Sequence, residues 1–132
     1  MRIVVIDGQG GRLGRLLVEE CRTALPDAEI WAIGANAAAT AAMLKAGADA
    51  GATGENPVVV ASASADYILG PLGIVLADAM MGEITAAMAA AVGRSRAHKI
   101  LIPMTRCCAS VAGIQDLPLN EYVRLAVAEI KA

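Results

Sequence analysis

Four glycines stand within seven residues near the start of the chain, in the stretch GQGGRLG at residues 8–14. Glycine loses more backbone entropy on folding than any other residue, so such a cluster needs a reason. Backbone N–H groups without shielding side chains can approach a phosphate, and the N-terminus of a following helix adds a partial positive charge. The cluster therefore predicts a phosphate-binding turn; the alternative is a tight strand-to-helix turn without a ligand.

The glycine spacing suggests a part for each position of this loop. Gly8 would make the tight turn, and Gly14 would let the helix pack on the strand. Gly10 and Gly11 would let backbone N–H groups reach the phosphate. The spacing departs from the stricter G-x-G-x-x-G because position 13 is leucine. The predicted nucleotide-binding residues of the loop are Asp7, Gly8, Gln9, Gly10, Gly11, Arg12, Leu13 and Gly14.

Asn36 stands where Rossmann proteins place an acid that binds the adenosine ribose. Its side chain could bond a ribose hydroxyl or could serve only as a helix cap. Glu29 has about the right offset in sequence, but it begins its predicted strand and so belongs to the opposite edge of the sheet. No acid and no nearby arginine selects between the two nicotinamide dinucleotides, and the expected cofactor is NAD or NADP.

Two later loops, GPLG and MTRCC, are expected to face the same crevice, because open α/β sheets bind ligands at the carboxyl ends of their strands. Arg106 could bind a phosphate or a carboxylate. It would also lower the pKa of Cys107, a candidate nucleophile or redox thiol, for which a small residue in a turn is the alternative. The candidate residues in these loops are Gly70, Pro71, Thr105, Arg106 and Cys107.

Other reactive side chains have structural interpretations. Glu83 precedes Thr85, an expected N-cap, so its charge is predicted to complement a helix terminus. Cys21 lies on the apolar stripe of the first helix and is predicted to pack in the core. The adjacent pair Cys107–Cys108 lacks the spacing of a zinc site and has only His98 to join it, so no metal site is expected.

Strand and helix patterns alternate along the chain. The segment 48–64 is ambiguous, because PVVVA suits a strand whereas Asn56-Pro57 is typical of a helix start. Parallel neighbours need a crossover of a dozen or more residues, which favours a strand at 50–53 and a helix from Pro57. Strands are predicted at 3–6, 30–33, 50–53, 66–70, 99–103 and 111–114, and helices at 13–24, 37–46, from 57, 74–81, 86–92 and 122–130.

This alternation predicts a single domain over residues 1–132, a three-layer α/β Rossmann-like fold with a mostly parallel sheet of five or six strands. The net charge of −2 and the scattered arginines lack the basic footprint of a nucleic-acid binder. The longest uncharged run, residues 30–44, is shorter than the roughly eighteen residues of a membrane span. Without a signal-peptide pattern, and with an odd number of cysteines, the protein is expected in the cytoplasm.

Several sequence blocks carry resemblances. VIDGQGG, KAGADAGATGEN, GPLGI, GEIT and KILIP resemble a family of short bacterial proteins of unknown function with a predicted Rossmann-like fold. That resemblance covers nearly the whole chain and implies the fold but no activity. The stretch GQGGRLGR is similar to the start of dihydrodipicolinate reductases, which are NAD(P)H enzymes. This second resemblance covers only about the first twenty residues.

Two functions fit these patterns. In one, the chain is a nucleotide-binding module that acts as a sensor, carrier or subunit with a small-molecule nucleotide. In the other, it is a small oligomeric oxidoreductase that uses a nicotinamide cofactor. Dehydrogenases normally need a second domain for acid–base groups, which favours the module. The methionines and alanines of residues 74–92 exceed what one face can bury against a small sheet, so a homo-oligomer is expected.

Overall fold

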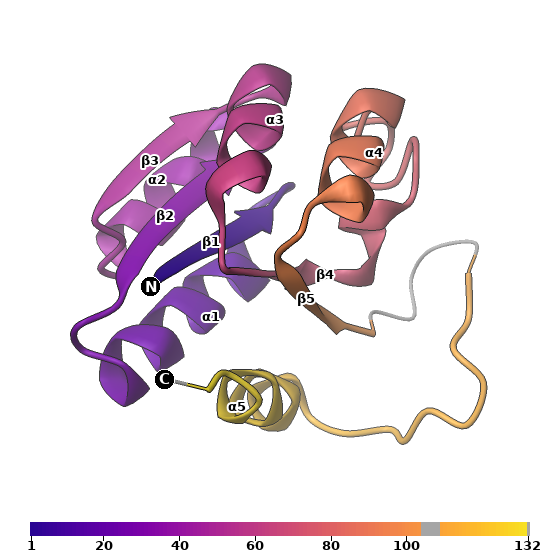
Figure 1. The fold of residues 1–132 in the computed structure, drawn as a ribbon. Coiled ribbons are helices and arrows are strands. Elements are labelled where there is room, and N and C mark those ends of the chain that lie inside the picture. The colour runs from indigo at the N-terminus through magenta and orange to yellow at the C-terminus, as the bar shows by residue number, and fades with distance from the viewer. Residues whose placement is uncertain (104–108, 132) are drawn as a thin grey trace.

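The computed structural model describes residues 1–103 and 109–131 of the chain. Within them, parallel strands form one sheet in the order β3-β2-β1-β4-β5 (Figure 1). This order matches a Rossmann sheet, with its switch point between β1 and β4. The predicted Rossmann-like fold is confirmed. The strands are β1 (Arg2–Asp7), β2 (Glu29–Gly34), β3 (Ala50–Thr53), β4 (Tyr67–Pro71) and β5 (His98–Ile102).

Helices cover both faces of the sheet and complete three layers (Figure 1). On one face lie α1 (Arg12–Ala24), α2 (Ala37–Lys45) and α5 (Leu119–Ala128); on the other lie α3 (Glu55–Ser64) and α4 (Ala86–Arg94). Alternate side chains of β1 point to opposite faces, so Ile3 and Val5 join the first core while Val4 and Ile6 join the second. Residues 3–6 of β1 are buried on both faces of the sheet, which explains their continuous apolar run.

Local signals place most helix ends as predicted. The Asn36 side chain accepts a hydrogen bond from the Ala39 N–H, and the Thr85 hydroxyl accepts one from the Met88 N–H, so both residues cap helices. The ambiguous segment contains β3 and α3, as the crossover argument required. Cys21 is fully buried in the first core, which confirms its packing role.

The predicted sixth strand at residues 111–114 is wrong. These residues form a turn, and Val111 and Ile114 are 43% and 37% exposed. Instead of a strand, the chain returns to the first face, where α5 packs against α1 and β5. Apolar residues in a short run fit a strand pattern, but here no neighbouring strand edge pairs with them.

The predicted helix at 74–81 is also wrong. A single 3-10 turn, η1 (Leu72–Val75), is followed by tight turns in which Asp78, Met80 and Met81 have φ of 67°, 59° and 56°. Residues in this left-handed region cannot continue a right-handed helix. After these turns the chain runs back toward residues 8–14, which we call the glycine loop. There it contributes to the site described below.

The expected apolar surplus of residues 74–92 is smaller than the composition suggests. Met88 is only 2% exposed and lies in the second core, whereas Met81 is 98% exposed. The fully exposed methionine surface of this segment is therefore Met81, while Met80 is partly buried. Among the described residues, no helix has the length and apolar character needed to cross a membrane.

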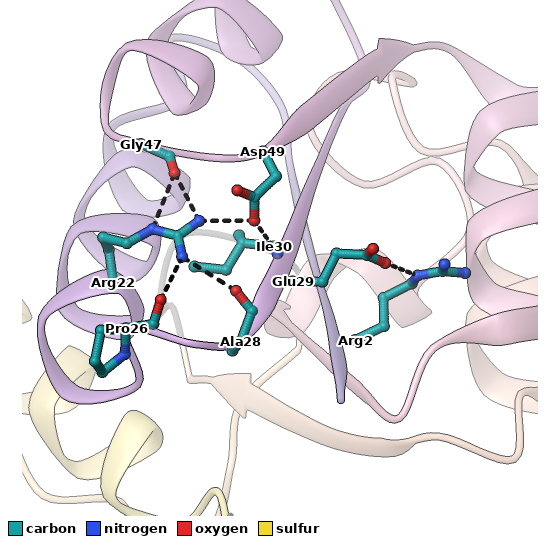
Figure 2. Close-up of polar contacts among 8 residues, drawn as sticks. All are labelled: Arg2, Arg22, Pro26, Ala28, Glu29, Ile30, Gly47 and Asp49. Carbon is teal, nitrogen blue, oxygen red and sulfur yellow. Dashed lines mark hydrogen bonds and ion pairs between the residues drawn. The ribbon is translucent and has the colours of Figure 1, made fainter.

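The amino-terminal edge of the sheet is held by matched charges (Figure 2). The Arg22 guanidinium donates to the carbonyls of Gly47, Pro26 and Ala28 and to the Asp49 carboxylate, 2.7 Å away. Asp49 also accepts the Ile30 N–H at 2.8 Å. This cluster ties α1 to the segments that lead into β2 and β3. On the same edge Arg2 forms an ion pair with Glu29 and donates to the Ser64 hydroxyl, and its guanidinium lies 3.8 Å above the Trp31 ring.

Candidate functional site

The glycine loop joins β1 to α1 at the carboxyl edge of the sheet, and its glycines have distinct roles. Gly11 is the N-cap of α1 with φ of 74°, and a Cβ there would lie 2.7 Å from the Ala39 Cα of α2. A Cβ on Gly14 would lie 2.8 Å from the Asp7 Cβ of β1 and 2.6 Å from the Met43 sulfur of α2, so Gly14 lets α1 pack on the strand as predicted and also against α2. Gly10 alone of these has open space around its Cβ position. Gly10, rather than Gly11, therefore offers room for a ligand to approach.

Asp7 is the last residue of β1, and its side chain forms hydrogen bonds to the backbone of the glycine loop. Its carboxylate accepts the Gly8 N–H at 2.8 Å and the Gly14 N–H at 2.6 Å, and the residue is 5% exposed. Burial raises the pKa of Asp7, and the nearby Glu83 carboxylate adds to the rise, while the two N–H donors oppose it. The Asp7 carboxylate thus already accepts one N–H from the loop and one from the first turn of α1, and these two hydrogen bonds fix the loop conformation.

Three backbone N–H groups of the loop remain available. Gly10, Arg12 and Leu13 donate no main-chain hydrogen bond to any described residue. The N-terminus of α1 adds its partial positive charge at this point. The Arg12 side chain is exposed and forms no ion pair within residues 1–103 and 109–131. These four groups are the donors that an incoming anion would meet.

A cleft of about 820 Å³ opens above these donors, at the carboxyl ends of β1, β4 and β5. Its position at the switch point is the usual ligand site of an open parallel sheet. No residue of β2 or α2 contributes to it, so the cleft lies on the β4 and β5 side of the glycine loop. The residues that line it are Asp7–Leu13, Pro71, Gly73, Ala79, Met80, Pro103, Ile114–Leu117, Leu119 and Tyr122.

The cleft brings together only part of the predicted site. Asp7 to Leu13 and Pro71 line it, but Gly14, Asn36 and Gly70 do not. Gly70 packs between strands, since its Cβ would lie 2.4 Å from the Ile6 carbonyl oxygen. Thr105, Arg106 and Cys107 lie outside the described residues.

Sequence reasoning missed the wall formed by residues 114–122. The strand predicted at 111–114 and the helix predicted at 122–130 border this segment, and the residues between them give no periodic signal. The Tyr122 hydroxyl donates to the Gln115 carbonyl and links the segment to α5. Only the packing of α5 against α1 brings Tyr122 to the glycine loop.

Glu83 also has a different position from the predicted one. Its Oε1 accepts the Gln9 N–H at 2.6 Å, and its Oε2 accepts the Asn36 side-chain amide at 2.6 Å. The same amide donates to the Gln9 carbonyl at 2.9 Å. Glu83 therefore does not simply complement the terminus of α4, but bridges the loops that follow β1 and β2. Its sequence separation from both loops gave no signal of this contact.

Three comparisons place the chain among known proteins. A family model described as a domain of unknown function, DUF3842, matches residues 2–132, which confirms the expected resemblance to a family of unknown function. No curated protein matches the chain. The resemblance to dihydrodipicolinate reductases finds no support in these comparisons.

Among solved structures, the chain is similar to a dodecameric FMN-dependent UbiX-like decarboxylase from Escherichia coli O157:H7. The likeness has a TM-score of 0.50 and covers 97% of this chain and 75% of the other. With 16% sequence identity, it is a likeness of fold.

Proposed function

Because the chain belongs to the DUF3842 family, whose description assigns no activity, we propose from its own geometry that it binds a phosphate-bearing nucleotide in the cleft at the switch point. The observation that carries this proposal is the group of N–H donors of Gly10, Arg12 and Leu13 on the wall of the cleft, which find no acceptor among the described residues. Helix N-termini with such donors bind phosphates. The cleft volume is within the range of about 300–1,000 Å³ that is typical of small-molecule sites.

In this proposal the phosphate contacts the Gly10, Arg12 and Leu13 amides, and the Arg12 guanidinium neutralises its charge. NAD and NADP, expected from the sequence, and FMN, on which the similar decarboxylase depends, all carry a suitable phosphate. We infer a binding module rather than a reductase, because no histidine or lysine among the described residues lines the cleft. The alternative, a small oxidoreductase, would have Asp7, Asp116 and Tyr122 as the acid–base groups among the described residues that line the cleft.

A thermal-shift panel of NAD, NADP, FMN, FAD, ATP and coenzyme A tests this proposal. A ligand that binds the native state alone stabilises it by about 2.7 kcal/mol at a hundredfold excess over its Kd. Gly10→Val should abolish the shift, because its side chain would project into the open space above the donors.

Gly93→Val is the matched control, since its Cβ also meets open space but on α4, away from the cleft. This control should keep the full shift. Absence of any shift across the panel for the unsubstituted protein, or an equal shift in Gly10→Val, would contradict the proposal.

We also propose that the chain forms a homo-oligomer, with the cytoplasm as its location because its cysteine usage suits a reducing compartment. The almost completely exposed Met81 side chain favours self-association, and the similar decarboxylase is itself dodecameric. Met81→Asn suits the left-handed backbone at this position and removes the apolar contact. Light scattering should report an assembly that this variant weakens; a monomer at micromolar concentration before substitution would contradict the proposal.

A further inference from the structure

The segment between η1 and α4, residues 76–85, crosses the glycine loop, and we call it the strap. Internal hydrogen bonds hold its shape: the Asp78 N–H donates to the Ile84 carbonyl at 2.7 Å, and the Ile84 N–H donates to the Ala79 carbonyl at 3.2 Å. The three left-handed residues described above allow these tight turns. The strap is therefore a defined structure that presents Met80 and Glu83 to the loop.

Met80 and Glu83 fill the space above Gly8. A Cβ on Gly8 would lie 2.7 Å from the Met80 sulfur and 2.7 Å from the Glu83 Oε1. The same carboxylate lies 2.6 Å from the Gln9 nitrogen and 2.6 Å from the Asn36 side-chain nitrogen. It thus stands between the glycine loop and the end of β2.

In dinucleotide-binding Rossmann folds, the space between the glycine loop and the end of β2 is part of the ligand site. The pyrophosphate sits at the N-terminus of the first helix, and the adenosine ribose bonds to a side chain at the end of β2. Here Asn36 is the side chain at the end of β2, and its amide is already engaged by Glu83 and by the Gln9 carbonyl. The open cleft lies on the other side of the loop, without a residue from β2 or α2.

We propose that the strap occupies, and so closes, the space where the adenosine half of a dinucleotide would bind. The cleft then takes a single nucleotide and excludes dinucleotides, and Glu83 is the residue that determines this specificity. The inference rests on the proposed function and narrows its ligand class. An adenosine would have to displace the Glu83 carboxylate from two hydrogen bonds and the Met80 side chain from Gly8. The carboxylate would also repel the second phosphate of a pyrophosphate at close range.

Paired ligands that differ by an adenylate group provide the test: FMN against FAD, and nicotinamide mononucleotide against NAD. The unsubstituted protein should bind the mononucleotide of at least one pair at least tenfold more tightly than the corresponding dinucleotide. In Glu83→Ala this preference should fall at least tenfold, with less than threefold change in mononucleotide affinity. Glu55→Ala removes an exposed carboxylate from α3, outside the cleft, and should keep the original preference.

Amide hydrogen exchange at Gln9 gives a second readout. The Gln9 N–H should be protected in the unsubstituted protein, stay protected when a mononucleotide binds, and lose protection in Glu83→Ala. A mononucleotide that exposes this N–H would show that the strap moves aside for the ligand, which would overturn the closure.

The two proposals fail in different ways. Equal affinities in every pair that binds, or an unchanged preference in Glu83→Ala, would overturn the closure but leave nucleotide binding intact. A dinucleotide bound by Glu83→Ala alone would support the closure. If no compound binds either protein, the proposed function and the closure both fail.

Discussion

Two aspartates at opposite edges of the same sheet have opposite pKa shifts. At the amino-terminal edge, Asp49 accepts the Ile30 N–H and pairs with Arg22, and these contacts lower its pKa (Figure 2). At the carboxyl edge, burial raises the pKa of Asp7, and Glu83 is the charge that faces it. One edge pairs its carboxylates with arginines, whereas the other brings two carboxylates together at the glycine loop.

The difference separates stability from binding within one sheet. Matched donors and acceptors at the amino-terminal edge hold neighbouring segments together and leave little for a ligand to add. At the carboxyl edge, the raised pKa of Asp7 and the amides that no described residue accepts are features that cluster at functional sites. Substitutions at the two edges should therefore have separable effects.

The largest effect should distinguish the loop framework from its ligand-contacting positions. Gly11→Ala places a Cβ against the Ala39 backbone at positive φ, and should lower the free energy of unfolding by about 3 kcal/mol. Gly10→Ala, in open space, should change it by less than about 0.5 kcal/mol. Urea denaturation measures both. Similar losses at the two positions would show that the loop is a single structural unit with no separate ligand-contacting position.

At the amino-terminal edge, Arg22→Ala should lower the free energy of unfolding by about 2 kcal/mol, because three carbonyls and Asp49 lose a charged donor. Ligand affinity should be unchanged. Arg15→Ala, which removes an exposed pair with Glu19 on the same helix, is the control and should cost at most about 0.5 kcal/mol. If Arg22→Ala weakens nucleotide binding while the protein stays folded, the two edges do not separate stability from binding.

The smallest effects should appear in the pH dependence of stability. The native pKa of Asp7 lies above 3.8, so its contribution to stability should fall as pH rises from 3.8 toward that native pKa, by up to about 1.4 kcal/mol per pH unit. The native pKa of Asp49 lies below 3.8, so its contribution is present above 3.8 and is lost as pH falls through the native pKa.

Urea denaturation of Asp7→Asn and Asp49→Asn between pH 2.5 and roughly 7 should therefore give differences from the unsubstituted protein with opposite slopes. The Asp7 difference should change above 3.8 and the Asp49 difference below it. Slopes of the same sign would remove the contrast between the two edges.

The sequence by itself determined the alternation of strands and helices, the caps at Asn36 and Thr85, and the glycine loop after β1. These features follow from local physics: apolar periodicity, side chains that satisfy helix-end N–H groups, and backbone freedom. Even the choice between strand and helix near Pro57 needed only the length of a parallel crossover.

Tertiary structure alone decided which groups meet at the carboxyl edge. The strap carries Glu83 to Gln9 and Asn36, and the packing of α5 on α1 brings Tyr122 to the cleft. Residues 74–81 and 111–114 have apolar patterns that suit regular elements, but in the fold they form turns. Contacts between residues far apart in sequence depend on how whole elements pack, and local periodicity carries no information about that packing.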